Sequence, residues 1–175
     1  MIVPDRKHQE LVYQDKVQKI YRVSADFGAF EKEYFVREAG ERSGVVVVND
    51  GAVLLVRQYR LEVDRLSWEI PGGGIDDSET PEEAVLRECL EETGIMCRGL
   101  EPLIHYQPGL DTLKNPTWLF HTNEFEVVSP PVCNPGEVQA VEWVSLEKCF
   151  QMIREGEMLD AFTLIALFSY RFLKA

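Results

Sequence analysis

The chain has 175 residues, of which 45% are apolar, with a formal net charge of -12 and a sequence pI near 4.7. This length and apolar content predict one catalytic domain with a substantial core, together with a small additional subdomain. The negative charge opposes binding to nucleic acid or to anionic lipid, because both partners are themselves negatively charged. We therefore expect neither nucleic acid nor a membrane as a partner.

The cellular compartment is suggested by two further features. The first sixteen residues contain no apolar stretch of signal-peptide length, and no window approaches the roughly 18 uninterrupted apolar residues of a membrane span. The four cysteines show neither C-x-x-C nor disulfide-like spacing: Cys89, Cys97, Cys133 and Cys149. Such cysteines are typical of reduced, buried thiols, so a cytoplasmic location is predicted.

The amino-terminal part is rich in strand patterns. Mixed alternation over residues 17–36, interrupted by turn-forming residues at 24–28, predicts a hairpin. Two aliphatic runs follow at 45–48 and 52–56. They are joined by the turn sequence Asn-Asp-Gly, which is a strong signal for a second hairpin.

The middle of the chain contains a glycine triplet and a helix. The triplet at 72–74 follows a short strand at 68–71 and is predicted to be a loop, because three adjacent glycines weaken any regular element. Thr80 is an N-cap residue, followed by a proline at the first helical position and by a glutamate three residues after the cap. These signals predict a helix that ends near Thr93, with Gly94 as its carboxyl-terminal cap.

The carboxyl-terminal part predicts more strands and then helices. Strands are expected at 99–106, 117–125 and 139–144, and the loop between the first two is long enough to be functional. The tail from Leu146 has helical periodicity with a break at Gly156. This order predicts an α+β domain or a three-layer sandwich.

Three carboxylates share one face of the predicted helix. On an ideal helix, Glu88, Glu91 and Glu92 fall within an arc of about 100 degrees. The other flank is apolar and is expected to face the core: Val85, Leu86, Cys89 and Leu90.

A solvated acidic stripe is the simpler interpretation of these glutamates. Helix electrostatics oppose it, because Glu91 and Glu92 lie in the last turn, where the helix dipole disfavours anions. Like charges one turn apart also cost a few tenths of a kcal/mol per pair. A bound cation would relieve both effects, and oxygen-only ligands select a hard ion, Mg²⁺ or Mn²⁺.

The same segment resembles the Nudix box, G-x5-E-x7-R-E-U-x-E-E-x-G-U. It matches from Gly73 through Glu79 and the run from Arg87 to Ile95, nine constrained positions over 23 residues, with Cys89 a mild variant at an aliphatic position. The resemblance implies a Nudix-type α/β/α sandwich with a mixed sheet and a loop-helix-loop metal site. The implied metal ligands are Glu88, Glu91, Glu92 and the backbone carbonyl of Gly72. The implied supporting residues are the pair Glu79 and Arg87, which orients the loop, and the backbone-geometry positions Gly73 and Gly94.

Segments outside the box resemble the ADP-ribose and nucleoside-diphosphate-sugar pyrophosphatase branch of this family. They are RQYR at 57–60, WEIPGGG at 68–74 and YQPGLD at 106–111, with Pro108 following the box at a similar interval. The branch carries an amino-terminal strand subdomain that forms a homodimer. By this resemblance, residues 1–40 serve dimerisation and substrate contact, and residues 41–175 form the Nudix domain.

The branch resemblance also suggests individual roles. Arg60 is expected to contact the substrate diphosphate, for which a planar guanidinium is suited; a surface arginine is the alternative. Glu69 is expected to bind a ribose hydroxyl or another substrate group, or else to form a plain ion pair. Glu137 fits the position of a distant catalytic glutamate in the loop before the last strand, and Glu142 is its rival. Tyr21, Phe27 and Tyr34 are equal candidates for stacking on the base.

These residues together imply metal-dependent hydrolysis of a nucleoside diphosphate derivative, either ADP-ribose or a nucleotide sugar. Water would attack the diphosphate, with Glu137 or a box glutamate such as Glu91 or Glu92 taking its proton. Two alternatives remain open: a nucleoside triphosphate pyrophosphatase built on the same box, and a non-catalytic nucleotide-sugar sensor.

Overall fold

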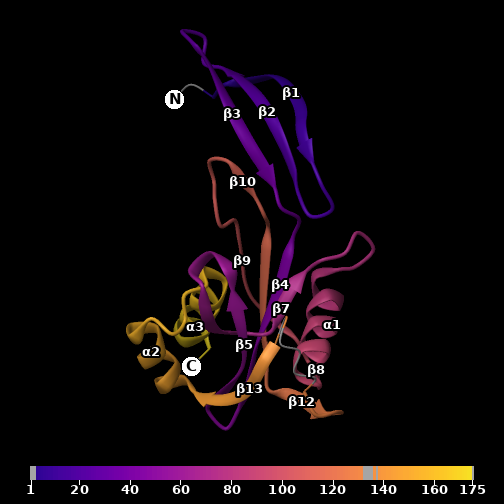
Figure 1. The fold of residues 1–175 in the computed structure, drawn as a ribbon, viewed down its shortest axis with the longest axis vertical. Coiled ribbons are helices and arrows are strands. Elements are labelled where there is room, and N and C mark those ends of the chain that lie inside the picture. Colours follow the sequence, from indigo (N-terminus) through magenta and orange to yellow (C-terminus); the bar gives the residue numbers. More distant parts are fainter. Residues whose placement is uncertain (1–2, 132–135, 137, 175) are drawn as a thin grey trace. The chain divides into compact units, whose positions relative to one another are not determined.

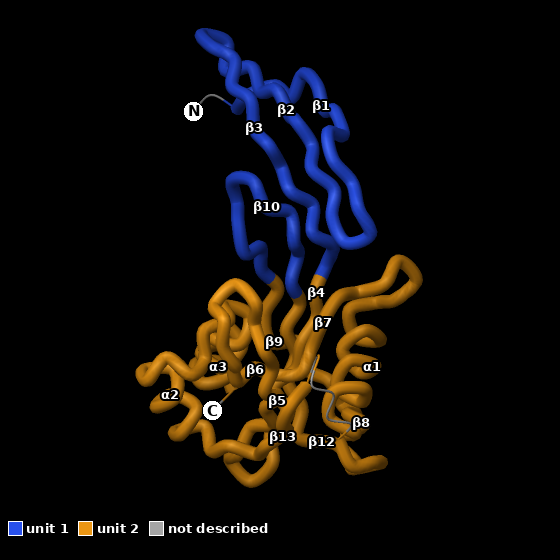
Figure 2. The backbone as a smooth tube through the Cα atoms, in the orientation of Figure 1, with its two compact units in different colours: residues 1–41, 106–117 blue, residues 42–105, 118–175 orange. Residues whose placement is uncertain are grey.

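The computed structural model describes residues 3–131, 136 and 138–174. The chain forms two compact units, shown in different colours in Figure 2. The first contains residues 1–41 and 106–117, and the second contains residues 42–105 and 118–175. The sequence analysis divided the chain once, after residue 40. In the structure, residues 106–117 belong to the first unit as well.

The first unit is a four-stranded sheet with the order β1-β2-β3-β10. Its strands are β1 (Asp5–Gln14), β2 (Lys19–Asp26), β3 (Glu31–Glu38) and β10 (Leu113–Lys114). The antiparallel pair of β2 and β3 confirms the first predicted hairpin, and β10 joins β3 in parallel. Strand β1 was not predicted, because every one of its residues is exposed and no buried alternation marks it.

The second unit contains a seven-stranded sheet and a separate pair of strands. The main sheet has the order β13-β5-β4-β11-β9, with β6 paired to β5 and β7 paired to β4, and β12 pairs with β8. The strands of the main sheet are β4 (Arg42–Asn49), β5 (Ala52–Arg60), β6 (Arg65–Glu69), β7 (Gly72–Gly74), β9 (Glu101–Tyr106), β11 (Thr117–Thr122) and β13 (Val138–Ser145). The separate pair consists of β8 (Ile95–Arg98) and β12 (Glu124–Val127).

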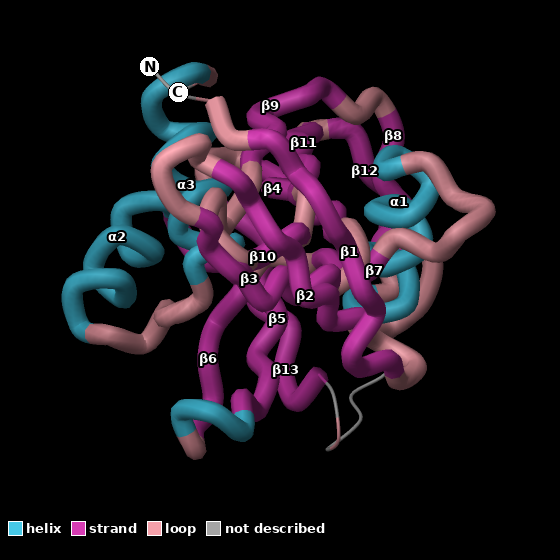
Figure 3. The backbone as a smooth tube through the Cα atoms, turned by 90° about the horizontal axis from the view of Figure 1, so that it is seen from above, coloured by secondary structure: helices cyan, strands magenta, loops and turns pink. Residues whose placement is uncertain are grey.

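The helices cover both faces of this sheet. They are α1 (Pro81–Thr93), α2 (Leu146–Glu155) and α3 (Ala161–Leu173), with a short 3-10 helix η1 (Leu61–Val63). In Figures 1 and 3, α1 lies on one side of the sheet and α2 and α3 lie on the other. The expected α/β/α sandwich is therefore confirmed. Among the described residues, no helix combines the length and apolar character needed to cross a bilayer.

The local signals of the helices and of the second hairpin are also confirmed. The Thr80 hydroxyl accepts a hydrogen bond from the Glu83 amide at 3.2 Å, and the Glu83 carboxylate accepts one from the Thr80 amide at 2.8 Å. Gly94 ends α1 in the left-handed region at φ 71°. Gly156, at φ 73°, ends α2 at the predicted break. The turn of the second hairpin places Asp50 and Gly51 at positive φ, as its sequence predicts.

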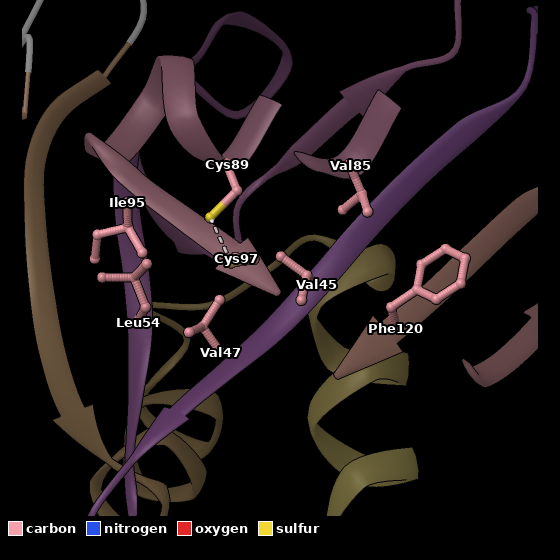
Figure 4. Close-up of a cluster of buried hydrophobic side chains, with 8 residues drawn as sticks. All are labelled: Val45, Val47, Leu54, Val85, Cys89, Ile95, Cys97 and Phe120. Carbon is pink, nitrogen blue, oxygen red and sulfur yellow. Dashed lines mark hydrogen bonds between the residues drawn. The ribbon is translucent and has the colours of Figure 1, made fainter. Parts of the chain in front are cut away.

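One hydrophobic core joins α1 to the sheet. The helix contributes Val85 and Cys89, both fully buried (Figure 4). They pack among strand residues from β4, β5, β8 and β11: Val45, Val47, Leu54, Ile95, Cys97 and Phe120. The expectation that Leu90 also faces the core is wrong, since it is 39% exposed.

The structure also differs from the sequence analysis at three places in the sheets. Residues 117–125 form two strands, β11 and β12, which belong to different sheets, and β8 directly after Gly94 was not predicted. The glycine triplet is not a loop but strand β7, which pairs antiparallel with residues 42–44 of β4. Pairing with a neighbouring strand compensates for the weak intrinsic preference of glycine, and such pairing is a tertiary effect.

Candidate active site

A pocket of about 310 Å³ opens in the second unit beside β7 and the acidic face of α1. Its lining brings together the three box glutamates and two arginines: Arg42, Gln58, Arg60, Gly72, Gly73, Gly74, Glu88, Glu91, Glu92 and Val138. The shared face that helix geometry predicted for Glu88, Glu91 and Glu92 is therefore a wall of this pocket.

Glu92 is half-buried and accepts a hydrogen bond at each of its carboxylate oxygens. Its Oε1 accepts a hydrogen bond from the side-chain amide of Gln58 at 2.6 Å, and its Oε2 accepts one from the backbone amide of Gly72 at 3.0 Å. Burial raises the pKa of Glu92 to about 7, and the negative charge of Glu88 adds to the shift, against the two hydrogen bonds. Glu92 thus carries a charge that its surroundings disfavour.

Arg87 is the centre of a hydrogen-bonding network around the other carboxylates. Its Nε and Nη2 donate to the two oxygens of Glu79 at 2.7 and 2.8 Å, and Nη2 also donates to the carbonyl of Gly74 at 3.1 Å. Its Nη1 donates to Glu88 at 2.8 Å and to Glu91 at 3.3 Å. The guanidinium lowers the pKa of Glu79 to about 2, and the Glu79 carboxylate in turn raises the pKa of Arg87. The network joins the loop before α1, strand β7 and the helix, which is the arrangement that the box resemblance implied for Glu79 and Arg87.

The glycines of β7 allow α1 to approach closely. A Cβ atom on Gly73 would overlap the carboxylate of Glu88, and one on Gly72 would overlap the carbonyl oxygen of Ser43 in β4. Gly72 also has φ +153°, a conformation that side chains disfavour. At the other end of α1, a Cβ on Gly94 would overlap the carbonyl of Ser129. Ligation of a metal by the Gly72 carbonyl stays a prediction.

Arg60 and Glu69 bind each other. Arg60 Nε donates to Glu69 Oε1 at 2.8 Å, and Nη2 donates to Oε2. The Glu69 side chain is only 3% exposed, whereas that of Arg60 is 43% exposed and lines the pocket. Of the two roles expected for Glu69, the structure thus shows the ion pair. Contact between either residue and a substrate stays a prediction.

The sequence analysis assigned no role to two polar side chains that line the pocket, those of Arg42 and Gln58. Arg42 lies at the start of β4 with its guanidinium 4.4 Å from the ring centre of Phe162, and Gln58 lies on β5 between Arg57 and Arg60. Gln58 is part of the RQYR segment at 57–60, but the sequence analysis assigned a role only to the last arginine of that segment. Nothing local distinguishes Arg42 from other surface arginines.

The candidates for a distant catalytic glutamate fall in two places. Glu137 lies outside the described residues. Glu142 is an exposed residue of β13 and lines a different pocket, beside Trp143 and Lys148. No histidine of the described chain is among the residues that line the pocket. His8 is exposed on β1, His105 stacks on Trp118 and His121 packs against Tyr170.

The fit of a metal ion can be judged from the donor groups. Within the described part of the chain, no three His, Cys, Asp or Glu side chains are grouped closely enough to hold an ion as they stand. Arg87 binds Glu88 and Glu91 on one side of the pocket, and neutral amides bind Glu92 on the other. The donors nevertheless fit a hard divalent cation, because all are carboxylate oxygens and the hydrogen-bond donors to Glu92 are neutral amides.

Comparison with known proteins decides the family. The family profile described as "NUDIX domain" matches residues 40–162. The chain belongs to the Nudix family. It is thus a Nudix hydrolase, and the resemblance noted in residues 73–95 is confirmed over most of the second unit.

Several relatives of this Nudix hydrolase have names that state an activity. It is 31% identical over 143 residues to a CMP-5'-(N-acetyl-N-hydroxy-3-aminopropyl)phosphonate hydrolase of Streptomyces rubellomurinus, covering 80% of this chain and 68% of the relative. It is 26% identical over 162 residues to the ADP-ribose pyrophosphatase of Bacillus subtilis, covering 91% and 88% of the two chains.

A solved structure supports the fold. The crystal structure of an ADP compounds hydrolase superposes with a TM-score of 0.83, covers 96% of this chain and 92% of the other, and is 19% identical in sequence. At this identity the likeness shows the fold alone. Because nearly the whole chain is covered, the likeness includes the amino-terminal β unit as well as the Nudix domain.

Proposed function

We propose that this Nudix hydrolase cleaves the diphosphate linkage of a nucleoside diphosphate derivative, ADP-ribose or a nucleotide sugar, into a nucleoside monophosphate and a sugar phosphate. Mg²⁺ is the proposed cofactor, and Mn²⁺ is its proposed substitute. Glu88, Glu91 and Glu92 are the side chains that would hold it. The names of two relatives support this class, since one is a hydrolase of a CMP–phosphonate compound and the other a pyrophosphatase of ADP-ribose.

One observation carries the proposal: three carboxylates and two guanidinium groups line the same pocket. Carboxylates alone would repel an anionic diphosphate, whereas guanidinium groups are suited to bidentate phosphate contacts. A pocket that holds both kinds of group fits a phosphate-containing ligand that binds together with cations. Arg60 and Arg42 are the residues we assign to the diphosphate.

The reaction adds water across one phosphorus–oxygen bond of the diphosphate. A bound divalent ion supplies charge neutralisation and a more acidic bound water. Within the protein, Glu137 is the proposed acceptor of the proton from water, with Glu91 or Glu92 as alternatives. Arg87 binds Glu79 before α1 and the Gly74 carbonyl of β7, so it holds the strand against the helix. Glu69 orients Arg60 through the Nε and Nη2 atoms of the guanidinium. The Nη1 atom of Arg60 takes no part in that ion pair, and we assign it to the diphosphate.

The substrate class is tested with purified protein, Mg²⁺ and a panel of ADP-ribose, ADP-glucose, GDP-mannose, UDP-glucose, dinucleotides and triphosphates, with products identified by mass. We expect AMP and ribose phosphate from ADP-ribose, or the matching products from a nucleotide sugar. Release of pyrophosphate from triphosphates, with the diphosphate derivatives untouched, would replace the proposal by a triphosphate pyrophosphatase. Ligand-induced thermal stabilisation without turnover would replace it by a sensor.

We also propose that the protein is a homodimer formed through its amino-terminal unit. Strand β1 is the edge of that sheet, is exposed at every residue and carries three consecutive large side chains with exposed surface, Leu11, Val12 and Tyr13. An exposed edge with apolar side chains favours pairing with another chain. Light scattering during size-exclusion chromatography should give about twice the 20.1 kDa chain mass. A monomeric mass at micromolar concentration would exclude the dimer.

A further inference from the structure

The three box glutamates differ in what binds them. Glu88 and Glu91 both accept hydrogen bonds from the charged guanidinium of Arg87. Glu92 accepts its two hydrogen bonds from neutral donors, the side-chain amide of Gln58 and the backbone amide of Gly72. Each oxygen of the Glu92 carboxylate accepts a hydrogen bond from a different donor, so both oxygens are held in place.

Gln58 lies on a strand that is paired on both sides. It lies on β5, which is paired on one side with β13 and on the other with β6, and its partners in the register are Val138 and Ser67. Gln58 and Arg60 are two residues apart on this strand, so their side chains point to the same face, and both line the pocket. Glu92 comes from α1, on a separate element. The hydrogen bond of 2.6 Å therefore ties the helix carboxylate to the sheet.

We propose that Gln58 is a positioning residue, which holds Glu92 in the orientation needed to bind a divalent cation. The inference rests on the proposed function and names a further residue on which the same site depends. A neutral amide suits this role because it donates a hydrogen bond without neutralising the carboxylate. A guanidinium in the same place would compete with a cation for that charge. Partners that orient a ligating group in this way typically change metal affinity or activity by about 10- to 100-fold when removed.

The test is Gln58→Met, which keeps the length of the side chain and removes the donor. Mn²⁺ binding is measured by electron paramagnetic resonance, and turnover is measured on the preferred substrate of the panel. We expect the Mn²⁺ dissociation constant to rise by about tenfold or more, and kcat to fall within the range of about 10- to 100-fold. Gln58→Asn, whose amide is one methylene shorter, should change both quantities in the same direction and serves if the Met variant does not fold.

Gln151→Met is a matched control. Gln151 donates a hydrogen bond of 2.6 Å to Glu155 on the exposed surface of α2, so this variant removes a glutamine–glutamate bond of the same length elsewhere. It should leave the Mn²⁺ dissociation constant and kcat unchanged. If the Gln58 variants behave in the same way, the inference is overturned while the proposed function stands.

Two further outcomes also decide against the inference. A lower melting temperature in the Gln58 variants, with an unchanged Mn²⁺ dissociation constant, would assign Gln58 a purely structural role. A wild-type protein that neither binds Mn²⁺ nor hydrolyses any member of the panel would overturn the proposed function and this inference together. The wild-type measurements therefore separate failure of the function from failure of the inference.

Discussion

The guanidinium of Arg87 binds the carboxylate of Glu79 through two parallel hydrogen bonds, of 2.7 Å from Nε and 2.8 Å from Nη2. Glu79 lies in the loop just before α1, and Arg87 lies two turns into the helix. The bidentate geometry fixes the loop against the helix more firmly than a single contact between point charges would. Because the same guanidinium also reaches Glu88, Glu91 and the carbonyl of Gly74, it sets the shape of the acidic wall.

Replacing Arg87 by lysine tests this network. Lysine keeps the positive charge but presents a point donor, so it cannot satisfy Glu79 in two places while also reaching Glu88. We expect Arg87→Lys to lower kcat/KM by about 10- to 100-fold, the range typical of residues that support metal ligands. Urea denaturation should show a loss of stability of about 1–3 kcal/mol, since hydrogen bonds between charged groups are lost. Wild-type kinetics in a folded Arg87→Lys protein would contradict the assignment.

Glu92→Gln tests the metal site directly. The substitution removes one negative charge from the pocket and leaves the size of the side chain almost unchanged. Turnover should fall by orders of magnitude, because the amide is a poor ligand for a hard cation. Circular dichroism should show the same fold as the wild type. Near-normal turnover in this variant would remove Glu92 from the metal site.

The raised pKa of Glu92 predicts a pH dependence of stability in the absence of divalent ions. Burial raises the pKa to about 7 in the folded protein, from 4.5 for an ordinary glutamate. The folded state therefore binds the proton more tightly, and the stability from this group is complete below about pH 4.5 and is lost as the pH rises through about 7. The side-chain amide of the Glu92→Gln variant cannot titrate.

The measurement is the melting temperature of both proteins in EDTA between about pH 5 and pH 8. The wild type should lose stability relative to the variant across this interval, because its carboxylate must ionise inside the fold. All other titrating groups are shared, so the difference between the two proteins isolates residue 92. A difference that stays constant with pH would show that Glu92 has no raised pKa.

Gly73→Ala tests the close approach of β7 to α1. The new Cβ would overlap the carboxylate of Glu88, which is the flexible end of a side chain and can move aside. We therefore expect a small change in melting temperature but a large loss of activity, because Glu88 leaves its place. Gly74→Ala is the neighbouring control: a Cβ there meets no protein atom within 4 Å, so Glu88 should keep its place and kcat/KM should fall much less than in Gly73→Ala. Equal effects of the two substitutions would argue against displacement of Glu88.

The buried cysteines predict low thiol reactivity in the native protein. Cys89 and Cys149 are fully buried and Cys97 is 3% exposed. Burial raises the pKa of the Cys149 thiol to about 11, so its reactive thiolate is scarce at neutral pH. Iodoacetamide at pH 8 should leave these three residues unlabelled until denaturant is added, as read by peptide mass spectrometry. Rapid native labelling of Cys149 would contradict the burial.

The parts of the protein that the sequence predicted are those encoded by neighbouring residues. The caps of α1 at Thr80 and Gly94 depend on contacts within a few residues, and the spacing of Glu88, Glu91 and Glu92 follows from helix geometry alone. The hairpin turn at Asp50 and Gly51 is likewise local. The family was predicted from the resemblance of residues 73–95 to the Nudix box, and the shared face of the three glutamates from their helical spacing.

The tertiary structure determines which residues from other parts of the chain line the pocket together with Glu88, Glu91 and Glu92. Gln58 binds Glu92, which lies 34 residues further along the chain, and Arg42 pairs in register with Gly74. No local sequence pattern predicts such contacts. The glycine triplet became β7 because β4 lies beside it, and the exposed β1 became a strand because β2 pairs with it. A helix depends on contacts between residues three or four apart, whereas a sheet and a pocket depend on chain segments brought together by folding.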